Sequence, residues 1–395
     1  MRQRVDSPTS LCLVRGVPPG TAAARSNSGR PRSAPERILI VRLSSFGDVI
    51  QTLPLLPAIR RRNPTAKIGW VIDRELADAI EGHQYLDFIH HCDRNRWGRD
   101  FTNPLKWPRL LREIRQLAAE IDAIRYDVAI DAQGLFKSAT IPYMAGIPRR
   151  VGFAHRREFT NLFYTEKIIS RDDYFDPSRH HLEHMLKLLG AIGCEIGEYS
   201  LVIPPENHAA AARIDYLLTK LEATGPIVVI APFTQWASKR WPLERWRMLA
   251  QRMLQDTNTG IVLVGASGDR ASAVELTEAI GESAAGRVLN LAGLTSIGDL
   301  YALFSRVQIT IAADTAPLHV AGAAGCPHLV GLFGSTSSTR TGPLGNSSKT
   351  SLSANPQMSC QPCLQRTCRY GTTECMLRIS PDDVLAELKK CLDAQ

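Results

Sequence analysis

Two strand-to-helix junctions, one near each end of the chain, constrain the fold more than any other feature. They are RILIVRLSSFGDVIQTLP (37–54) and VQITIAADTAPLHVAGAAGCP (307–327). Each begins with an apolar run of strand length, passes through a small-residue loop that carries a carboxylate, and then enters a helix. In open α/β sheets, ligands bind at such loops, outside the carboxyl ends of the strands. Two widely separated junctions therefore predict two sheet domains that face one cleft.

Between these junctions, apolar runs alternate with amphipathic segments of helix length, a pattern typical of parallel sheets covered on both faces. The pattern breaks at LVIPPEN (201–207), where Pro204 and Pro205 are expected to end a strand. We therefore predict an α/β protein with two Rossmann-like doubly wound domains, over 37–205 and 206–358, in preference to a βα barrel. The predicted strands lie at 38–43, 68–72, 88–91, 128–131, 227–231, 261–264, 288–291, 309–312 and 329–332. The predicted helices lie at 53–62, 107–124, 136–145, 181–192, 209–222, 243–255, 271–280, 297–305, 318–325 and 382–392.

The two ends of the chain differ in composition from these domains. Residues 1–36 are rich in Arg, Pro and Ser and are predicted to be disordered. They could form an organellar transit peptide, although a dispensable tail or an upstream start codon is the preferred interpretation. Residues 359–395 are predicted to form a Cys-rich segment and a C-terminal helix. After Pro343 the chain is expected to be irregular until that final helix. No apolar run reaches the length of a membrane-spanning helix, and the start lacks the apolar region of a secretory signal.

Four of the nine cysteines cluster as C-x2-C-x4-C-x6-C, at Cys360, Cys363, Cys368 and Cys375. Such thiols can surround a tetrahedral zinc ion, but these loop lengths are irregular for a zinc site. A Cys-rich surface loop with a labile disulfide is the alternative. The sequence leaves this choice open.

Two common nucleotide-binding signatures are missing: no G-x-G-x-x-G follows the first strand, and no G-x-x-x-x-G-K-[ST] occurs anywhere. This counts against a nicotinamide oxidoreductase and a P-loop kinase. The first strand is followed instead by a loop that includes Ser45, Gly47 and Asp48. Gly47 permits a tight turn. Asp48 could act as a general base on a hydroxyl, or could simply cap the following helix.

The second half offers polar side chains after two successive strands. Thr234 and Lys239 lie in APFTQWASKRWP (231–242), and Asp269 lies in GASGD (265–269). Lys239 could place a point charge on a phosphate, or it could be a solvated surface lysine. Asp269 could bind a ribose hydroxyl, as acidic residues do in nucleotide folds, or it could be a helix cap.

The second junction is suited to a pyrophosphate. Asp314, Thr315 and Ala316 lead into a helix whose Pro317 falls in the first turn, where its missing N–H has no cost. Backbone N–H groups at such a helix start attract phosphate. His319 lies one turn further on and could donate a hydrogen bond to the same ligand, although a lone histidine is more often structural.

A basic and aromatic cluster occupies the first half. Its members are Arg94, Arg96, Trp97, Arg99, Lys106, Trp107, Arg109, Arg149, Arg150, Arg156 and Arg157. Nucleic acid, an anionic small acceptor and an anionic membrane surface are all possible partners for such a cluster. An ordinary solvated charged face is the alternative.

Together, these segments closely resemble the glycosyltransferase family 9 heptosyltransferases over about residues 37–345. The most specific pieces are LIVRLSSFGDVIQTLP, YDVAIDAQGLFKSA, RRE…LFY (156–164), SKRWP and ADTAPLHVAGAAGCP. DAQGLFKSA and RRE…LFY are most similar to the members that add the first heptose to the Kdo of the lipid A–linked inner core. Asn95 and Gly98 depart from the more basic residues of the family, so the acceptor can differ in detail.

The resemblance implies a GT-B architecture and inverting, metal-independent chemistry without a cofactor. The C-terminal domain would bind ADP-L-glycero-D-manno-heptose and the N-terminal domain a Kdo-lipid A acceptor, with Asp48 as the catalytic base. The implied donor-binding residues are Ser45, Gly47, Thr234, Lys239, Asp269, Asp314, Thr315, Ala316 and His319. The implied acceptor-binding residues are Arg96, Arg99 and Arg157.

The expected protein is a monomer in peripheral contact with the cytoplasmic face of the inner membrane, and it does not bind nucleic acid. Two alternatives remain: a family member that uses heptose as acceptor, and a non-catalytic nucleotide- or nucleic-acid-binding protein.

Overall fold

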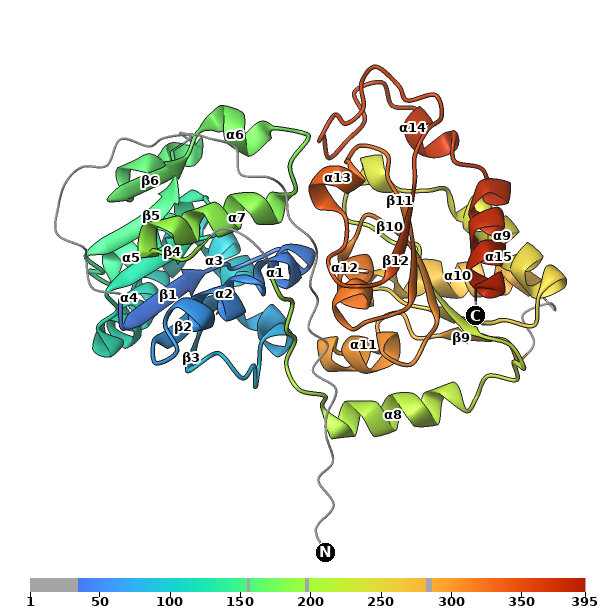
Figure 1. Ribbon diagram of the computed structural model, residues 1–395, viewed down its shortest axis with the longest axis horizontal. Helices are drawn as coiled ribbons and strands as arrows, with labels where there is room; N and C mark the ends of the chain where they lie inside the picture. The colour runs from blue at the N-terminus through green and yellow to red at the C-terminus, as the bar shows by residue number, and fades with distance from the viewer. Residues whose placement is uncertain (1–34, 155–156, 196–198, 282–285, 395) are drawn as a thin grey trace, which may run out of the picture.

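The computed structural model describes residues 35–154, 157–195, 199–281 and 286–394. Two six-stranded sheets, parallel in every strand pair, form two halves that lie side by side (Figure 1). The first sheet consists of β1 (Arg37–Val41), β2 (Lys67–Asp73), β3 (Phe88–Cys92), β4 (Val128–Asp131), β5 (Arg149–Phe153) and β6 (Glu166–Ile169). The second consists of β7 (Ile227–Ala231), β8 (Gly260–Leu263), β9 (Val288–Asn290), β10 (Ile309–Ala313), β11 (His328–Leu332) and β12 (Ser348–Leu352).

Both sheets have the same strand order. The first runs β3-β2-β1-β4-β5-β6, and the second has this order in the opposite direction, β12-β11-β10-β7-β8-β9. The winding therefore reverses between β1 and β4 in one half and between β7 and β10 in the other. Loops that leave the carboxyl ends of strands at such a reversal separate to opposite faces and leave a crevice. The predicted fold of two doubly wound parallel sheets is confirmed.

Three strands were not predicted from the sequence: β5, β6 and β12. Their sequences, RRVGF, EKII and SKTSL, carry charged or hydroxyl residues, whereas central strands such as β1 are almost wholly buried and apolar. β6 and β12 are edge strands, where polar residues are common. The prediction that the chain is irregular from Pro343 to the final helix was therefore wrong, as was the expected strand end before Pro204.

The first helix also differs from the prediction. Instead of one helix over 53–62, the chain forms α1 (Phe46–Thr52) and α2 (Leu55–Arg62). Pro54 separates them because it has no N–H to donate within a helix. Since α1 begins directly after the first loop, Asp48 lies in a helical first turn.

The remaining main helices lie close to their predicted ranges. They are α4 (Trp107–Ile124), α5 (Phe136–Met144), α7 (His181–Leu189), α8 (His208–Leu218), α9 (Leu243–Asp256), α10 (Arg270–Ile280), α11 (Ile297–Phe304), α12 (Ala316–Ala323) and α15 (Pro381–Asp393). Figure 1 shows α15 beside α9 on the second half, and the two helices are in contact.

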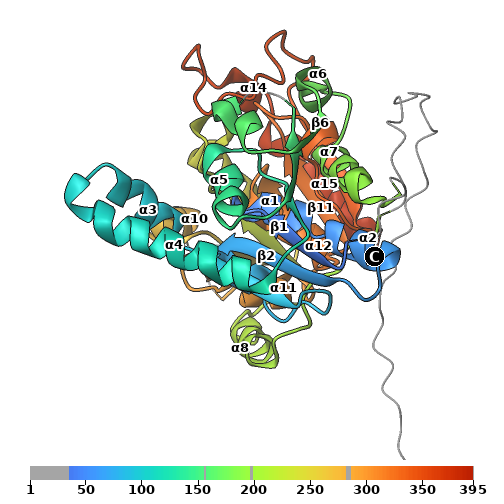
Figure 2. The same cartoon turned by 90° about the vertical axis from the view of Figure 1, so that its left-hand side faces the viewer.

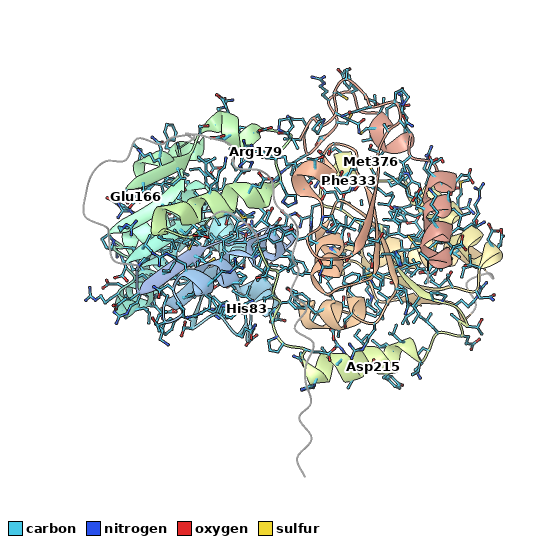
Figure 3. The ribbon with its side chains drawn as sticks, in the orientation of Figure 1. His83, Glu166, Arg179, Asp215, Phe333 and Met376 are labelled. Atoms are coloured by element: carbon cyan, nitrogen blue, oxygen red, sulfur yellow. The ribbon has the colours of Figure 1, made fainter. Side chains whose placement is uncertain are left out.

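The two halves share a packed boundary. Helix α1 contacts α12, and the 3-10 helix η1 (Arg74–Ala79) contacts α11. Tyr301 on α11 donates a hydrogen bond of 3.2 Å to the carbonyl of Ala79. In the segment that joins the halves, the Val202 carbonyl lies 3.0 Å from Nε2 of His83, which Figure 3 shows near the middle of the molecule. A single hydrophobic cluster contains residues of both halves.

The predicted disorder of residues 1–36 falls, except for Pro35 and Glu36, outside the described residues. The boundary at 205/206 stays a prediction. Among the described helices, none combines the length and the apolar character needed to cross a membrane.

Candidate active site

A cleft of about 180 Å³ lies between the halves, where the loops after β1, β7 and β10 meet. Its lining comes from both sides of the molecule: Ser45, Phe46, Gly47, Asp48, Gln51, Thr234, Gln235, Trp236, Lys239, Asp314, Thr315, Ala316, His319 and Thr341. Nine of the ten residues predicted for catalysis or donor binding are in this lining, and Asp269 is the exception.

Asp48 has one anchored carboxylate oxygen and one open one. Oδ2 accepts hydrogen bonds from the Ser45 backbone N–H at 3.1 Å and from Ser45 Oγ at 2.8 Å, and Nη2 of Arg42 lies 2.8 Å away. No described residue donates a hydrogen bond to Oδ1. The side chain is 37% exposed. Asp48 therefore caps α1 with one oxygen and presents the other to the cleft.

The surroundings keep Asp48 ionised. Burial raises the pKa of its carboxyl, but the charge of Arg42 and the Ser45 hydrogen bonds lower the pKa to about 2. Arg42 itself is buried and donates to the carbonyl of Ala132. Burial, together with Arg42, lowers the pKa of His181 to about 3, so this imidazole is neutral at physiological pH. A carboxylate in this state can accept a proton from an incoming hydroxyl.

Asp314 organises the opposite wall of the cleft. It follows β10, and its Oδ2 accepts hydrogen bonds from Lys239 Nζ at 2.7 Å and Thr341 Oγ1 at 3.2 Å. Its Oδ1 lies 3.5 Å from Nε2 of His319. Burial raises the pKa of Asp314, but the hydrogen bond from His319 and the charge of Lys239 outweigh it and hold the pKa well below its usual range. Asp314 therefore positions the lysine and the histidine.

The Lys239 ammonium and the N-terminus of α12 lie on the same wall of the cleft as Asp314. Lys239 Nζ lies 4.6 Å from the centre of the Trp236 ring, which adds a cation–π contact to its ion pair. Helix α12 begins at Ala316, after Thr315, and its first N–H groups have no acceptor within the helix. Together they form a positively polarised surface of the kind that binds phosphates.

Gly47 allows the two halves to approach closely. A Cβ atom at this position would lie 2.7 Å from Cδ2 of His319. Any larger residue at 47 would therefore push α1 away from α12.

Sequence reasoning missed several lining residues, among them Gln51 and Thr341. Gln51 Nε2 lies 3.3 Å from Nδ1 of His319 and donates to the Thr341 carbonyl at 3.2 Å. Gln51 could have been found, because it is three residues after Asp48 and so shares its helix face. Thr341 carries no such signal, since it belongs to the four-residue helix α13 (Ser338–Thr341) in a part of the sequence with no motif.

Four predicted residues are not in the cleft lining. Asp269 lies in the 3-10 turn η6 (Ser267–Asp269) before α10, where its Oδ2 accepts a hydrogen bond of 2.9 Å from the Ala266 N–H, so it acts as a cap. Arg96 makes a bidentate pair with Glu113, at 3.0 and 2.6 Å. Arg99 is exposed on α3 (Arg94–Phe101). Arg157 begins the 3-10 turn η3 (Arg157–Leu162), and its side chain lies outside the described part.

The Cys-rich segment supports the lysine side of the cleft. Ser238, next to Lys239, donates from its backbone N–H to the Arg366 carbonyl at 3.1 Å and from Oγ to the Gln365 carbonyl. Met376 fills the space at Gly334, and Figure 3 shows it near Phe333.

The four clustered cysteines are free thiols. Over the described ranges, no three His, Cys, Asp or Glu side chains are arranged to hold a metal ion.

The chain matches known proteins over most of its length. Residues 114–374 match glycosyltransferase family 9 (heptosyltransferase). Lipopolysaccharide heptosyltransferase 1 of Pseudomonas aeruginosa is 28% identical over 376 residues, which cover 90% of this chain and 98% of that protein.

Solved structures resemble the fold over most of its length. The family 9 glycosyltransferase of Veillonella parvula has a TM-score of 0.73 at 19% identity, covering 91% of this chain and 98% of its own. Escherichia coli ADP-heptose lipopolysaccharide heptosyltransferase II has a TM-score of 0.69 at 22% identity, with coverages of 90% and 98%. Because the family match spans more than half of the 395 residues, the chain belongs to glycosyltransferase family 9, the heptosyltransferase family, and is a glycosyltransferase.

Proposed function

We propose that this enzyme transfers heptose from ADP-L-glycero-D-manno-heptose to the Kdo of the lipopolysaccharide inner core, with inversion and without a metal ion. The observation that carries the proposal is the pairing of two kinds of chemistry in one cleft. The N-terminal half supplies an ionised carboxylate with one open oxygen, Asp48, and the C-terminal half supplies Lys239 and the start of α12.

The leaving group is ADP in this proposal. As the bond between the sugar anomeric carbon and the phosphate oxygen breaks, its electron pair stays on the phosphate. Lys239 and the first N–H groups of α12 stabilise the charge that develops there. Asp314 and Gln51 hold Lys239 and His319 in place, so these groups need little rearrangement during the reaction.

The nucleophile is an acceptor hydroxyl on the Asp48 side. Its oxygen forms the new bond to the anomeric carbon, and its proton passes to Oδ1 of Asp48. A base on the wall opposite the leaving ADP favours attack from the far side of the sugar, which inverts the anomeric centre. A carboxylate of the acceptor, brought close to Asp48, would raise the pKa of Asp48 and make it a better base.

The donor and acceptor assignments rest on relatives. Heptosyltransferase 1 of P. aeruginosa and ADP-heptose heptosyltransferase II of E. coli both match the chain nearly from end to end. The first favours a Kdo acceptor. The second keeps a heptosylated acceptor as the alternative within the family, and the loops of the basic cluster would select between them.

A monomer in peripheral contact with the cytoplasmic face of the inner membrane fits a lipid-anchored acceptor. Nucleic acid is a less suitable partner, because Arg94, Arg96 and Arg109 of the basic cluster already pair with acidic side chains of this chain. We therefore propose no nucleic-acid ligand. A purely nucleotide-binding role leaves the open oxygen of Asp48 unexplained.

Acceptor-dependent release of ADP tests the proposal. Purified protein is incubated with ADP-heptose and either Kdo2-lipid A or its heptosylated form, with and without EDTA. Turnover with Kdo2-lipid A, unchanged by EDTA and giving the opposite anomeric configuration in the product, is the expected result. Turnover only with the heptosylated acceptor would move the assignment to heptosyltransferase II. Loss of activity in EDTA, restored by a divalent cation, would contradict the metal-independent mechanism.

A further inference from the structure

Exposed apolar side chains concentrate on one part of the N-terminal half. Of fifteen large apolar side chains that are exposed in the described residues, nine lie on α3, α4, α5, η3 and the 3-10 turn η2 (Pro104–Lys106). They are Phe101, Leu105, Trp107, Leu111, Phe136, Tyr143, Met144, Phe159 and Leu162. Large apolar patches on a protein surface mark interaction sites. We call this surface the α3–α5 face.

The outer part of this face is the hairpin of α3 and α4. Figure 2 shows these helices extending beyond the rest of the N-terminal half. At the turn between them, Leu105 is 91% exposed and Phe101 69% exposed. The rings of Phe101 and Trp107 stack at 6.4 Å, and Trp107 Nε1 donates to the Phe101 carbonyl at 2.9 Å. Leu111, one turn after Trp107, continues the same apolar stripe.

Ion pairs, some between α3 and α4 and one within α4, hold this hairpin together. Glu113 on α4 pairs with Arg96 at 2.6 Å, accepts a hydrogen bond from Trp97 Nε1 at 3.0 Å and pairs with Arg109 at 3.0 Å. Lys106 pairs with Asp100 at 3.0 Å. These contacts fix the helices to each other while the apolar side chains of the turn remain in solvent.

Positive charge accompanies the apolar stripe. Residues 94–115 contain seven Arg or Lys side chains against two acidic ones, Asp100 and Glu113. Arg99, Arg112 and Arg115 are exposed, and none of them has an ion-pair partner among the described residues. Arginines next to exposed aromatic and aliphatic side chains are typical of surfaces that insert shallowly into anionic lipid.

The inner part of the face consists of α5 and η3. Helix α4 contacts α5, and α5 contacts η3. Phe163 packs edge-on against both Phe136, at 5.5 Å, and Tyr143, at 5.4 Å, and the Arg150 guanidinium lies 5.4 Å from the Tyr143 ring centre. The aromatic and basic character is therefore the same at both ends of the α3–α5 face.

We propose that the α3–α5 face docks on an anionic lipid bilayer. The apolar side chains of the α3–α4 turn enter the interface between headgroups and acyl chains, and Arg99, Arg112 and Arg115 contact lipid phosphates. The inference deepens the proposed function, on which it rests for its biological purpose, by assigning the surface that meets the membrane of a lipid-anchored acceptor. Lipid binding itself can be measured without that acceptor.

The test is sedimentation of the full chain with vesicles that contain no lipopolysaccharide, either phosphatidylcholine alone or phosphatidylcholine with phosphatidylglycerol. We expect at least about tenfold stronger partition onto the anionic vesicles. The triple variant Phe101→Ser, Leu105→Ser, Leu111→Ser should lose about tenfold or more of this partition. Arg112→Gln and Arg115→Gln should each cost about fivefold at low salt.

A matched control removes three exposed apolar side chains from outside the α3–α5 face. Tyr216, Leu294 and Tyr370 are 61%, 50% and 60% exposed, and their joint replacement by Ser should leave partition unchanged. Equal Tm values would show that both triple variants are folded. Equal partition of wild type onto both vesicle types, or wild-type partition of the Phe101/Leu105/Leu111 variant, would overturn the proposal. So would a wild-type dimer that this variant turns into a monomer, because the face would then pair two copies.

Vesicle binding and heptose transfer can fail independently. A protein that binds anionic vesicles but transfers no heptose keeps the docking surface and loses the proposed function. A protein that transfers heptose to a soluble acceptor but binds no vesicles keeps the proposed function and loses the docking surface.

Discussion

Lys239 is a single residue whose neighbours fix its charge in the cleft. It is held by Asp314 at 2.7 Å and by the Trp236 ring, so its charge is already in place before a ligand arrives. Lys239→Met should raise the KM for ADP-heptose about 10- to 100-fold, because the leaving phosphate loses a charged partner. Lys220→Met removes a lysine that also lies over an aromatic ring, that of Tyr216, but just after the end of α8 and outside the cleft lining, so it should leave the KM unchanged. A donor KM within twofold of wild type in Lys239→Met would exclude this role.

His184 sets part of the pH dependence of stability. It is fully buried, neither ring nitrogen has a hydrogen-bond partner, and burial, with Arg340, lowers its pKa from 6.5 to about 4. Below pH 6.5 the unfolded chain takes up a proton that the folded chain excludes, so stability falls as the pH falls from 6.5 toward 4. The unfolding free energy of His184→Leu minus that of wild type should therefore be about 2 kcal/mol higher at pH 5 than at pH 8. Urea unfolding at both pH values measures this, and an equal difference at both would contradict it.

At the residue scale, the sequence could identify side chains that directly follow strands. Asp48, Lys239, Asp314 and His319 lie in the loops and first helical turns that follow β1, β7 and β10, and the structure brings them together. Asp269 follows a strand in the same way but acts as a cap. The sequence gives no sign of which strand-end loop turns into the cleft, because that depends on where the sheet order reverses.

At the element scale, the contact between α1 and α12 determines the width of the cleft. Gly47→Ala places a Cβ 2.7 Å from Cδ2 of His319 and should destabilise the protein by about 1–3 kcal/mol and lower kcat/KM. Gly98→Ala, in α3, meets no atom within 4 Å, so it should be neutral or stabilising by up to about 1 kcal/mol. Thermal unfolding and steady-state kinetics of both variants test this pair. Equal behaviour of the two variants would show that the close approach has no effect.

Helices and central strands were predictable because burial imposes their hydrophobic patterns. Helix α4 and strands β4 and β7 begin and end where the sequence predicts. The first helix was predicted to begin at Leu53, whereas α1 ends at Thr52, before Pro54, and α2 follows Pro54. The hydrogen bonds from Ser238 to the carbonyls of the Cys-rich segment could not be predicted, because backbone carbonyls leave no trace in the side-chain sequence.

At the scale of the whole molecule, the two halves have the same strand order and share one hydrophobic cluster. Beyond the cleft, Arg340 on α13 donates to the carbonyls of Tyr174 and Asp176 in the N-terminal half. The halves should therefore unfold together, in one calorimetric transition whose Tm rises when ADP binds. Two separate transitions, with only one moved by ADP, would show that the shared boundary contributes little to stability.

In the proposed mechanism, Asp48 removes the proton from the acceptor while the opposite wall of the cleft holds the donor. Asp48→Asn keeps the shape of the side chain and a hydrogen-bond acceptor for Ser45, but removes the negative charge. The decisive measurement is therefore the kcat of Asp48→Asn with ADP-heptose and Kdo2-lipid A, together with its Kd for ADP. We predict a fall in kcat of about 10²–10⁴-fold with a Kd for ADP within about twofold of wild type. A kcat within tenfold of wild type in the folded variant would contradict the assignment of Asp48 as the base.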